Sequence, residues 1–174
     1  MRPRRRGGTE PTHEPVDAQP LQCVIDASVG VKLFLREPLS EQAEALFALL
    51  AANPPAQFYV PDLFFVECAN IVWKYVRRFG YPSRNASQDV HDLQRLQLRS
   101  VSTAELVVDA FAIALEHGLS AYDASYVALA QRLQSPLITA DERLARALQG
   151  TQHDVRWLGE YEVPPAGGKA QSQA

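Results

Sequence analysis

The sequence predicts an α/β fold in which short buried strands alternate with helices. Residues 21–26 (LQCVID) and 137–139 (LIT) are short and mostly apolar, which is typical of parallel strands buried on both faces. The stretch 119–144 indicates an amphipathic helix, a break at Ser135-Pro136, a buried strand and the start of another helix. Strands joined by helices in this way favour a parallel sheet.

The remaining elements follow from hydrophobic periodicity and from helix start and stop signals. In chain order we expect a strand at 21–26, a short helix near 29–36, a helix that Ser40 caps and that 53–55 ends, a strand at 57–60, a helix that Asp62 caps and Gly80 ends, a helix from 83 to about 96, an extended segment at 98–102, a helix at 103–117, a helix that Ser120 caps, a strand at 137–139, a helix at 142–149 and a strand near 153–158.

Composition indicates one domain over residues 21–163, with 1–20 and 164–174 as disordered polar tails. The net charge of −3 argues against a protein that coats nucleic acid through counterion release. No apolar run approaches the roughly 18 residues of a membrane span, and the N-terminal stretch lacks the apolar region of a secretory signal. We therefore expect a cytoplasmic protein without membrane contact, in which Cys23 and Cys68 are buried thiols.

Glu67 is the acidic residue that is hardest to explain structurally. It lies among apolar residues in the helix that follows Asp62, and a helix apolar on nearly every face is expected to be buried. A buried carboxylate without a partner costs several kcal/mol. Because helical side chains lean toward the N-terminus, we expect Glu67 to point to the carboxyl edge of the sheet, with Asn70 on the same face.

Three further carboxylates are expected at that edge. Asp26 ends the first strand, Asp123 lies in the first turn of the helix after Ser120, and Asp141 follows the strand at 137–139. Strand carboxyl ends and the N-termini of the following helices share one edge of a parallel sheet, where ligand sites of such folds lie. Taken singly, Asp123 also suits a capping box and Asp141 a helix cap, and caps are commoner than ligands.

Four acids at one place repel each other, so some must be protonated or a cation must bind. Oxygen ligands without His or Cys favour Mg²⁺, with Mn²⁺ as a substitute, over zinc. Such an ion lowers the pKa of its bound water and stabilises charge on an attacked phosphorus. The residues therefore predict metal-assisted hydrolysis of a phosphodiester, without a nucleophile from the protein.

Four segments also resemble a known family. VIDASVGVKLFL, PDLFFVECANIVW, SAYDASYVALAQRL and PLITADERL are similar, in order and spacing, to the signature of PIN-domain ribonucleases, and most of all to VapC-like toxins of bacterial toxin–antitoxin pairs. The resemblance spans residues 24–148. It implies a three-layer α/β/α sandwich with a short, mainly parallel central sheet, a Mg²⁺-dependent endoribonuclease acting on RNA, a homodimer and inhibition by a cognate antitoxin.

The same resemblance implies roles for individual residues. The catalytic acids fall on Asp26, Glu67, Asp123 and Asp141, the direct metal ligands on Asp26 and Asp123, the small hydroxyls near the ion on Ser28 and Thr139, and the helix amide on Asn70. Lys32 and Arg36 are candidate phosphate contacts, although exposed helix charges are usually only solvated.

Three alternatives stay open. A PIN-type nuclease could serve RNA maturation or DNA processing without a toxin role, and a PIN-fold protein could be a non-catalytic binding module. A phosphoryl-aspartate protein that uses Asp26 is disfavoured, because Ser28 stands where haloacid-type phosphatases need a second aspartate. The presence of all four acids argues against the binding module.

Overall fold

The structure is a computed structural model that describes residues 21–52 and 55–162. The predicted tails at 1–20 and 164–174 lie outside these residues. A sheet of five strands runs through the molecule in the order β3-β2-β1-β4-β5, and every neighbouring pair is parallel. The strands are β1 (Gln22–Ile25), β2 (Gln57–Pro61), β3 (Arg99–Val101), β4 (Leu137–Thr139) and β5 (Val155–Trp157).

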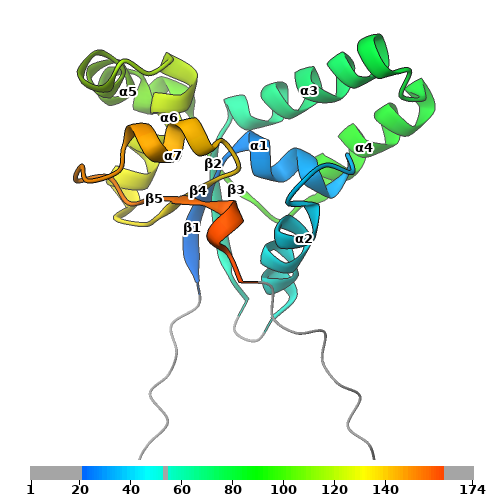
Figure 1. The fold of residues 1–174 in the computed structure, drawn as a ribbon, viewed down its shortest axis with the longest axis horizontal. Coiled ribbons are helices and arrows are strands. Elements are labelled where there is room, and N and C mark those ends of the chain that lie inside the picture. The colour runs from blue at the N-terminus through cyan, green and yellow to red at the C-terminus, as the bar shows by residue number, and fades with distance from the viewer. Residues whose placement is uncertain (1–20, 53–54, 163–174) are drawn as a thin grey trace, which may run out of the picture.

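Helices cover both faces of this sheet, which confirms the α/β/α sandwich (Figure 1). They are α1 (Ala27–Gly30), α2 (Ser40–Ala48), α3 (Leu63–Phe79), α4 (Ser83–Arg95), α5 (Thr103–His117), α6 (Ala121–Leu133) and α7 (Glu142–Ala147), with short 3₁₀ turns η1 (Val31–Leu33), η2 (Leu49–Ala51) and η3 (Leu158–Glu160). Figure 1 shows α5 and α6 together on one side of the sheet, and α3 and α4 on the other. No helix among the described residues combines the length and the apolar character needed to cross a bilayer.

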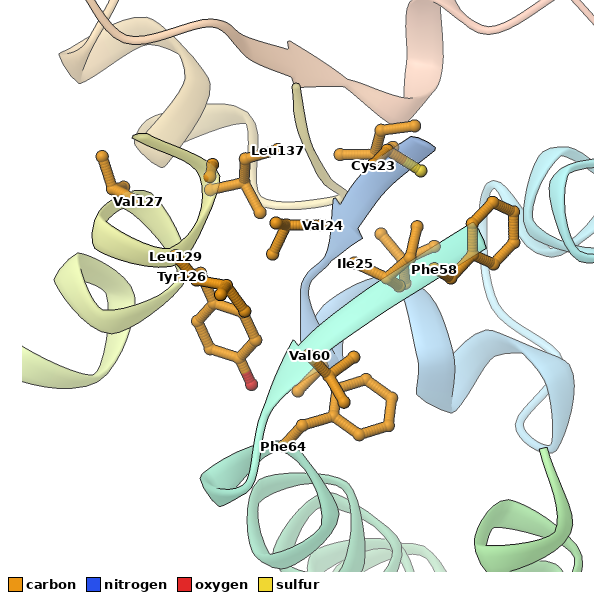
Figure 2. Packing of buried hydrophobic residues seen from close by; sticks show 14 of the residues in the cluster. Cys23, Val24, Ile25, Phe58, Val60, Phe64, Tyr126, Val127, Leu129 and Leu137 are labelled. Carbon is orange, nitrogen blue, oxygen red and sulfur yellow. The ribbon is translucent and has the colours of Figure 1, made fainter. Parts of the chain in front are cut away.

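The core lies between the sheet and these two helical layers. Val24, Phe58 and Val60 of the central strands are fully buried. Tyr126 of α6 covers the sheet from one layer and Phe64 of α3 from the other (Figure 2). The close packing of these buried strands thus fixes the positions of the carboxyl ends of β1 and β4.

A glycine sets the close approach of α1 to α3. A Cβ at Gly30 would lie 2.5 Å from Cζ and 2.8 Å from Cε2 of Phe64, a fully buried ring. Any side chain at residue 30 would therefore push α3 away from the end of β1, because protein interiors are close-packed.

Three sequence predictions about helices need correction. Ser40 is the first residue of α2 rather than its cap; Leu39 is the cap, at φ 72°, and the Ser40 hydroxyl accepts from the Glu37 N–H at 3.1 Å. Asp62 is the N-cap residue of α3, as predicted, but its carboxylate makes no capping hydrogen bond and accepts instead from the Thr103 N–H at 2.9 Å. Nor is α3 buried all round, since Trp73 is 57 % exposed.

Other predictions are confirmed. The segment near 98–102 is the edge strand β3, and Gly80 ends α3 in a left-handed conformation with φ 68°, which glycine adopts without steric cost. Cys23 and Cys68 are both free and buried.

Candidate active site

The site lies where the direction of chain winding reverses. The chain leaves β1 for β2 on one side and β4 for β5 on the other, while β1 and β4 are neighbours. Asp26 follows β1 directly, and Asp141 follows β4 after one intervening residue. Such a switch point leaves a crevice at the carboxyl ends of the strands, where α/β proteins bind ligands.

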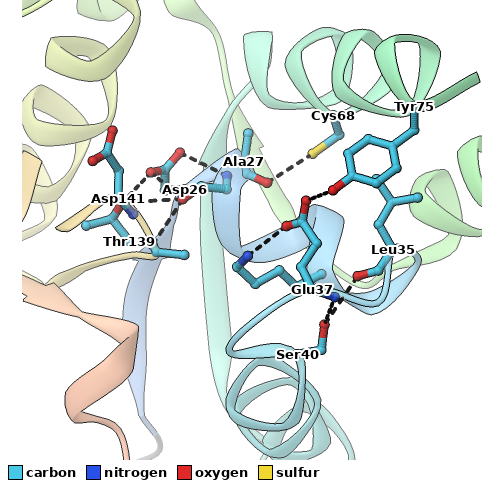
Figure 3. Close-up of polar contacts among 12 residues, drawn as sticks. Asp26, Ala27, Leu35, Glu37, Ser40, Cys68, Tyr75, Thr139 and Asp141 are labelled. Carbon is cyan, nitrogen blue, oxygen red and sulfur yellow. Dashed lines mark hydrogen bonds and ion pairs between the residues drawn. The ribbon is translucent and has the colours of Figure 1, made fainter. Parts of the chain in front are cut away.

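Asp26 is the centre of a hydrogen-bond network at this point. Its carboxylate, 8 % exposed, accepts from the Ser28 hydroxyl at 2.8 Å and from the Thr139 hydroxyl. Each hydroxyl in turn accepts a backbone N–H at 3.0 Å, Ser28 from Ala140 and Thr139 from Asp141. The backbone thus orients both hydroxyl protons toward Asp26, and Figure 3 shows the part of the network that Asp26, Thr139 and Asp141 form.

Burial raises the pKa of the Asp26 carboxyl above its usual value. The hydrogen bonds from Thr139 and Ser28 oppose this rise, and the negative charge of Asp123 adds to it. Burial and the charge of Asp123 thus make the negative form of Asp26 costly, and the two hydroxyl donors offset part of that cost.

Glu67 lies in the second turn of α3 and is half-buried. Its Oε2 accepts from the Tyr126 hydroxyl at 2.5 Å. Burial raises the pKa of the Glu67 carboxyl; the charges of Asp26 and Asp123 raise it further, against the hydrogen bond from Tyr126. Asp26, Glu67 and Asp123 come from three distant segments of the sequence. The structure brings them close enough for their charges to interact.

Asp123 is held by the start of its own helix. Ser120 caps α6, because its hydroxyl accepts from the Asp123 N–H at 3.1 Å and donates to the Asp123 carboxylate at 2.7 Å. The capping pair predicted from the sequence is confirmed. It does not exclude a second role for Asp123, because the charge of this residue still reaches Asp26 and Glu67.

Asp141 differs from the other three acids. Its carboxylate caps α7 by accepting from the N–H groups of Arg143 at 2.8 Å and Leu144 at 3.4 Å. The side chain is exposed, and the link to Asp26 runs through the backbone N–H that Thr139 accepts. The structure therefore places Asp141 at the same edge, but in the role of a helix cap.

The remaining site residues predicted from the sequence are Asn70, Lys32 and Arg36. Asn70 is exposed on α3, one turn beyond Glu67. The Lys32 ammonium pairs with Glu37 at 2.8 Å with only 10 % of its side chain exposed, and Arg36 pairs with Glu44 at 2.9 Å. Both cations thus form ion pairs with other glutamates, and neither pairs with Asp26, Glu67 or Asp123.

The acidic cluster, defined as Asp26, Glu67 and Asp123, suits a divalent cation by its chemistry. Within residues 21–52 and 55–162, no lysine, arginine or histidine forms an ion pair with any of its members. Its members offer carboxylate oxygens, with the Ser28 and Thr139 hydroxyls beside Asp26, and hard cations prefer such oxygen ligands. Over the same residues, no group of three or more His, Cys, Asp or Glu side chains is already arranged to coordinate a metal ion. Two of the three carboxylates instead accept hydrogen bonds within the protein, Asp123 from Ser120 and Glu67 from Tyr126.

Sequence reasoning missed Tyr126 as a member of this site. In the sequence Tyr126 is one of the apolar positions of the amphipathic helix within 119–144, and in the structure it is buried in the core. Its spacing of three residues from Asp123 was the available signal, because residues i and i+3 share a helix face.

Comparison with known proteins adds to this geometry. Residues 23–148 match the family model described as the PIN domain. The chain belongs to the PIN-domain family. Ribonuclease VapC3 of Pyrobaculum aerophilum is 39 % identical over 127 residues, which cover 72 % of this chain and 93 % of that protein.

Two solved structures share the fold of this PIN-domain protein. Mycobacterium tuberculosis VapC20, described as a toxin that cleaves the sarcin-ricin loop, superposes with a TM-score of 0.56 at 18 % identity, over 72 % of this chain and 94 % of that one. A toxin–antitoxin complex from Klebsiella pneumoniae gives a TM-score of 0.54 at 19 % identity, over 77 % and 95 %.

Proposed function

We propose that this PIN-domain protein is a metal-dependent endoribonuclease that acts as the toxin of a toxin–antitoxin pair. The observation that carries the proposal is the acidic cluster. The charge of Asp123 helps to raise the pKa of Asp26, and the charges of Asp26 and Asp123 help to raise the pKa of Glu67. No member of the cluster has a basic partner among the described residues. The identity of 39 % to a protein named as a ribonuclease supports RNA as the substrate.

Asp26 and Asp123 would hold the ion, Mg²⁺ or in its place Mn²⁺, with Glu67 and Asp141 completing the set of catalytic acids. The chemistry supplied by a bound ion is activation of water and stabilisation of charge on the attacked phosphate. Ser28 and Thr139 keep the Asp26 carboxylate fixed by donating to it. A preorganised carboxylate of this kind needs little rearrangement during the reaction.

The remaining candidates take supporting roles. Asn70 lies exposed one turn beyond Glu67 and would supply the helix amide near the ion. Lys32 and Arg36 are the candidate phosphate contacts, and they would reach RNA only by leaving Glu37 and Glu44.

The partners follow from the same proposal. Relatives solved as toxin–antitoxin complexes support a cognate antitoxin, and an apolar groove of about 570 Å³ between α3 and α4, lined by Val72, Trp73 and Val90 among others, suits an amphipathic partner helix. A homodimer in the cytoplasm completes the proposal. Val108, Phe111 and Leu115 support self-association, because they form one exposed apolar stripe on α5.

RNA cleavage by purified protein with Mg²⁺ tests the catalytic part. We expect Asp26→Asn and Asp123→Asn each to lower the cleavage rate at least about 100-fold, since preorganised electrostatic groups typically contribute that much. Asp109→Asn, on the exposed face of α5, is the matched control and should cleave as fast as wild type. Wild-type rates in either site variant would refute the proposal.

Expression without a partner separates the toxin from a nuclease of RNA maturation. We expect growth arrest with the wild-type chain and normal growth with Asp26→Asn at equal protein levels. Normal growth with a wild-type protein that cleaves RNA in vitro would favour the maturation enzyme. Arrest by both proteins would point instead to a binding module.

A further inference from the structure

One contact between α3 and α6 fixes an acid of the site. The Tyr126 hydroxyl donates to Glu67 Oε2 at 2.5 Å and joins residues 59 positions apart. Across residues 21–52 and 55–162, no other side chain donates a hydrogen bond to Glu67 and no basic group pairs with it. Among the described residues, the Tyr126 hydroxyl is therefore the one side-chain donor that orients the Glu67 carboxylate.

This hydroxyl is held rigidly. Tyr126 is 1 % exposed, and its ring lies between α6 and the central strands (Figure 2). A ring in a close-packed core cannot follow a carboxylate that moves. Because Tyr126 and Asp123 lie three residues apart on α6, the same helix supplies one acid and the anchor of another.

The chemistry of the anchor also suits the site. Burial raises the pKa of the Tyr126 hydroxyl far above its ordinary value, so this group stays a neutral donor. A lysine or arginine in its place would orient Glu67 but would also cancel its charge. A neutral donor leaves the negative charge of the acidic cluster available to a cation.

We infer that Tyr126 is a positioning residue of the site, whose hydroxyl holds the Glu67 carboxylate in the place required for metal binding and catalysis. The inference rests on the proposed function. It assigns to Tyr126 no contact with RNA or with an ion, and its effect passes through Glu67.

Tyr126→Phe tests the inference, because it removes the hydroxyl and keeps the ring. With Mg²⁺ and RNA we expect kcat to fall about 10- to 100-fold, as is typical when a hydrogen bond in the outer shell of a metal site is lost, while KM stays unchanged. Tyr126→Phe should add no further loss in a Glu67→Gln background. Tyr81→Phe, which removes a hydroxyl that donates to Asp89 of α4 at 2.7 Å in a part-buried pair outside the acidic cluster, is the control and should leave kcat unchanged.

Calorimetric titration with Mn²⁺ gives a second measurement that needs no activity. We expect Tyr126→Phe to weaken Mn²⁺ binding about 10- to 100-fold and Tyr81→Phe to leave it unchanged. If wild type cleaves no RNA but Tyr126→Phe still weakens Mn²⁺ binding, the nuclease proposal fails and the positioning role stands. Unchanged Mn²⁺ affinity in Tyr126→Phe, or losses that add fully to those of Glu67→Gln, would overturn the inference.

Discussion

The Thr139 hydroxyl offers a direct test of how the site is built. Thr139 is fully buried, and its hydroxyl both donates to the Asp26 carboxylate and accepts from the Asp141 N–H at 3.0 Å. Thr139→Val keeps the shape of the side chain and removes both bonds. A hydrogen bond to a charged group contributes about 1.5–3 kcal/mol and a neutral one about 1 kcal/mol, so we expect a loss of about 2–4 kcal/mol in the free energy of unfolding.

Urea unfolding of the metal-free protein measures this loss. Thr139→Ser is the matched control, because it keeps the hydroxyl and removes one methyl group, which costs about 1 kcal/mol. We expect the valine variant to unfold at a clearly lower urea concentration than the serine variant, and its Tm to fall by about 5–12 °C. A valine variant as stable as wild type would show that Asp26 does not depend on this hydroxyl, and the network would lose its structural role.

Three further predictions concern the core and the far edge of the sheet. Gly30→Ala should cost about 1–3 kcal/mol of stability, because the new methyl would overlap the Phe64 ring. Cys23 and Cys68 should resist alkylation in the folded protein at neutral pH, since burial raises both thiol pKa values, that of Cys23 to about 12. The folded protein should lose stability as the pH falls below 6.5, because of His153. Burial, and then the nearby charge of His117, lower the pKa of His153 in the folded state. The unfolded chain therefore takes up the proton first, and protonation favours unfolding.

Each of these predictions has its own control. Adding Phe64→Leu to Gly30→Ala should recover part of the loss, and no recovery would exclude the overlap as its cause. Labelling in urea should modify both thiols, and equally fast labelling of the folded protein would contradict their burial. His153→Gln should remove the loss of stability between pH 7.5 and 5.5, whereas the control His91→Gln, at an exposed histidine, should still show it. If His153→Gln shows the same loss as wild type, the loss comes from other groups.

Local signals predicted the part of the site that lies next to the strands. Asp26 follows a strand buried on both faces, and Ser120 and Asp123 form the capping pair at the start of α6. Both depend on neighbours in the sequence, so hydrophobic patterning and cap chemistry suffice to place them. The parallel order of β1 and β4 then brings these segments to one edge.

Tertiary contacts decided the rest. The bond from Tyr126 to Glu67 joins two helices, and no pattern within either helix specifies its partner. The apolar sequence of α3 predicted a buried helix, whereas its outer face, including Trp73, is exposed in this chain. An apolar helix face predicts burial against something, and the sequence of one chain does not say whether that is its own core or a partner.

Metal binding tests the central claim most directly. The claim is that the carboxylates gathered at the end of β1, in the second turn of α3 and at the start of α6 form a site for a hard divalent cation. Calorimetric titration of the metal-free protein with Mn²⁺ should show binding by wild type and by Asp109→Asn, and loss of binding in Asp26→Asn and Asp123→Asn. Equal Mn²⁺ affinity in all four proteins, or no binding by wild type, would contradict the account.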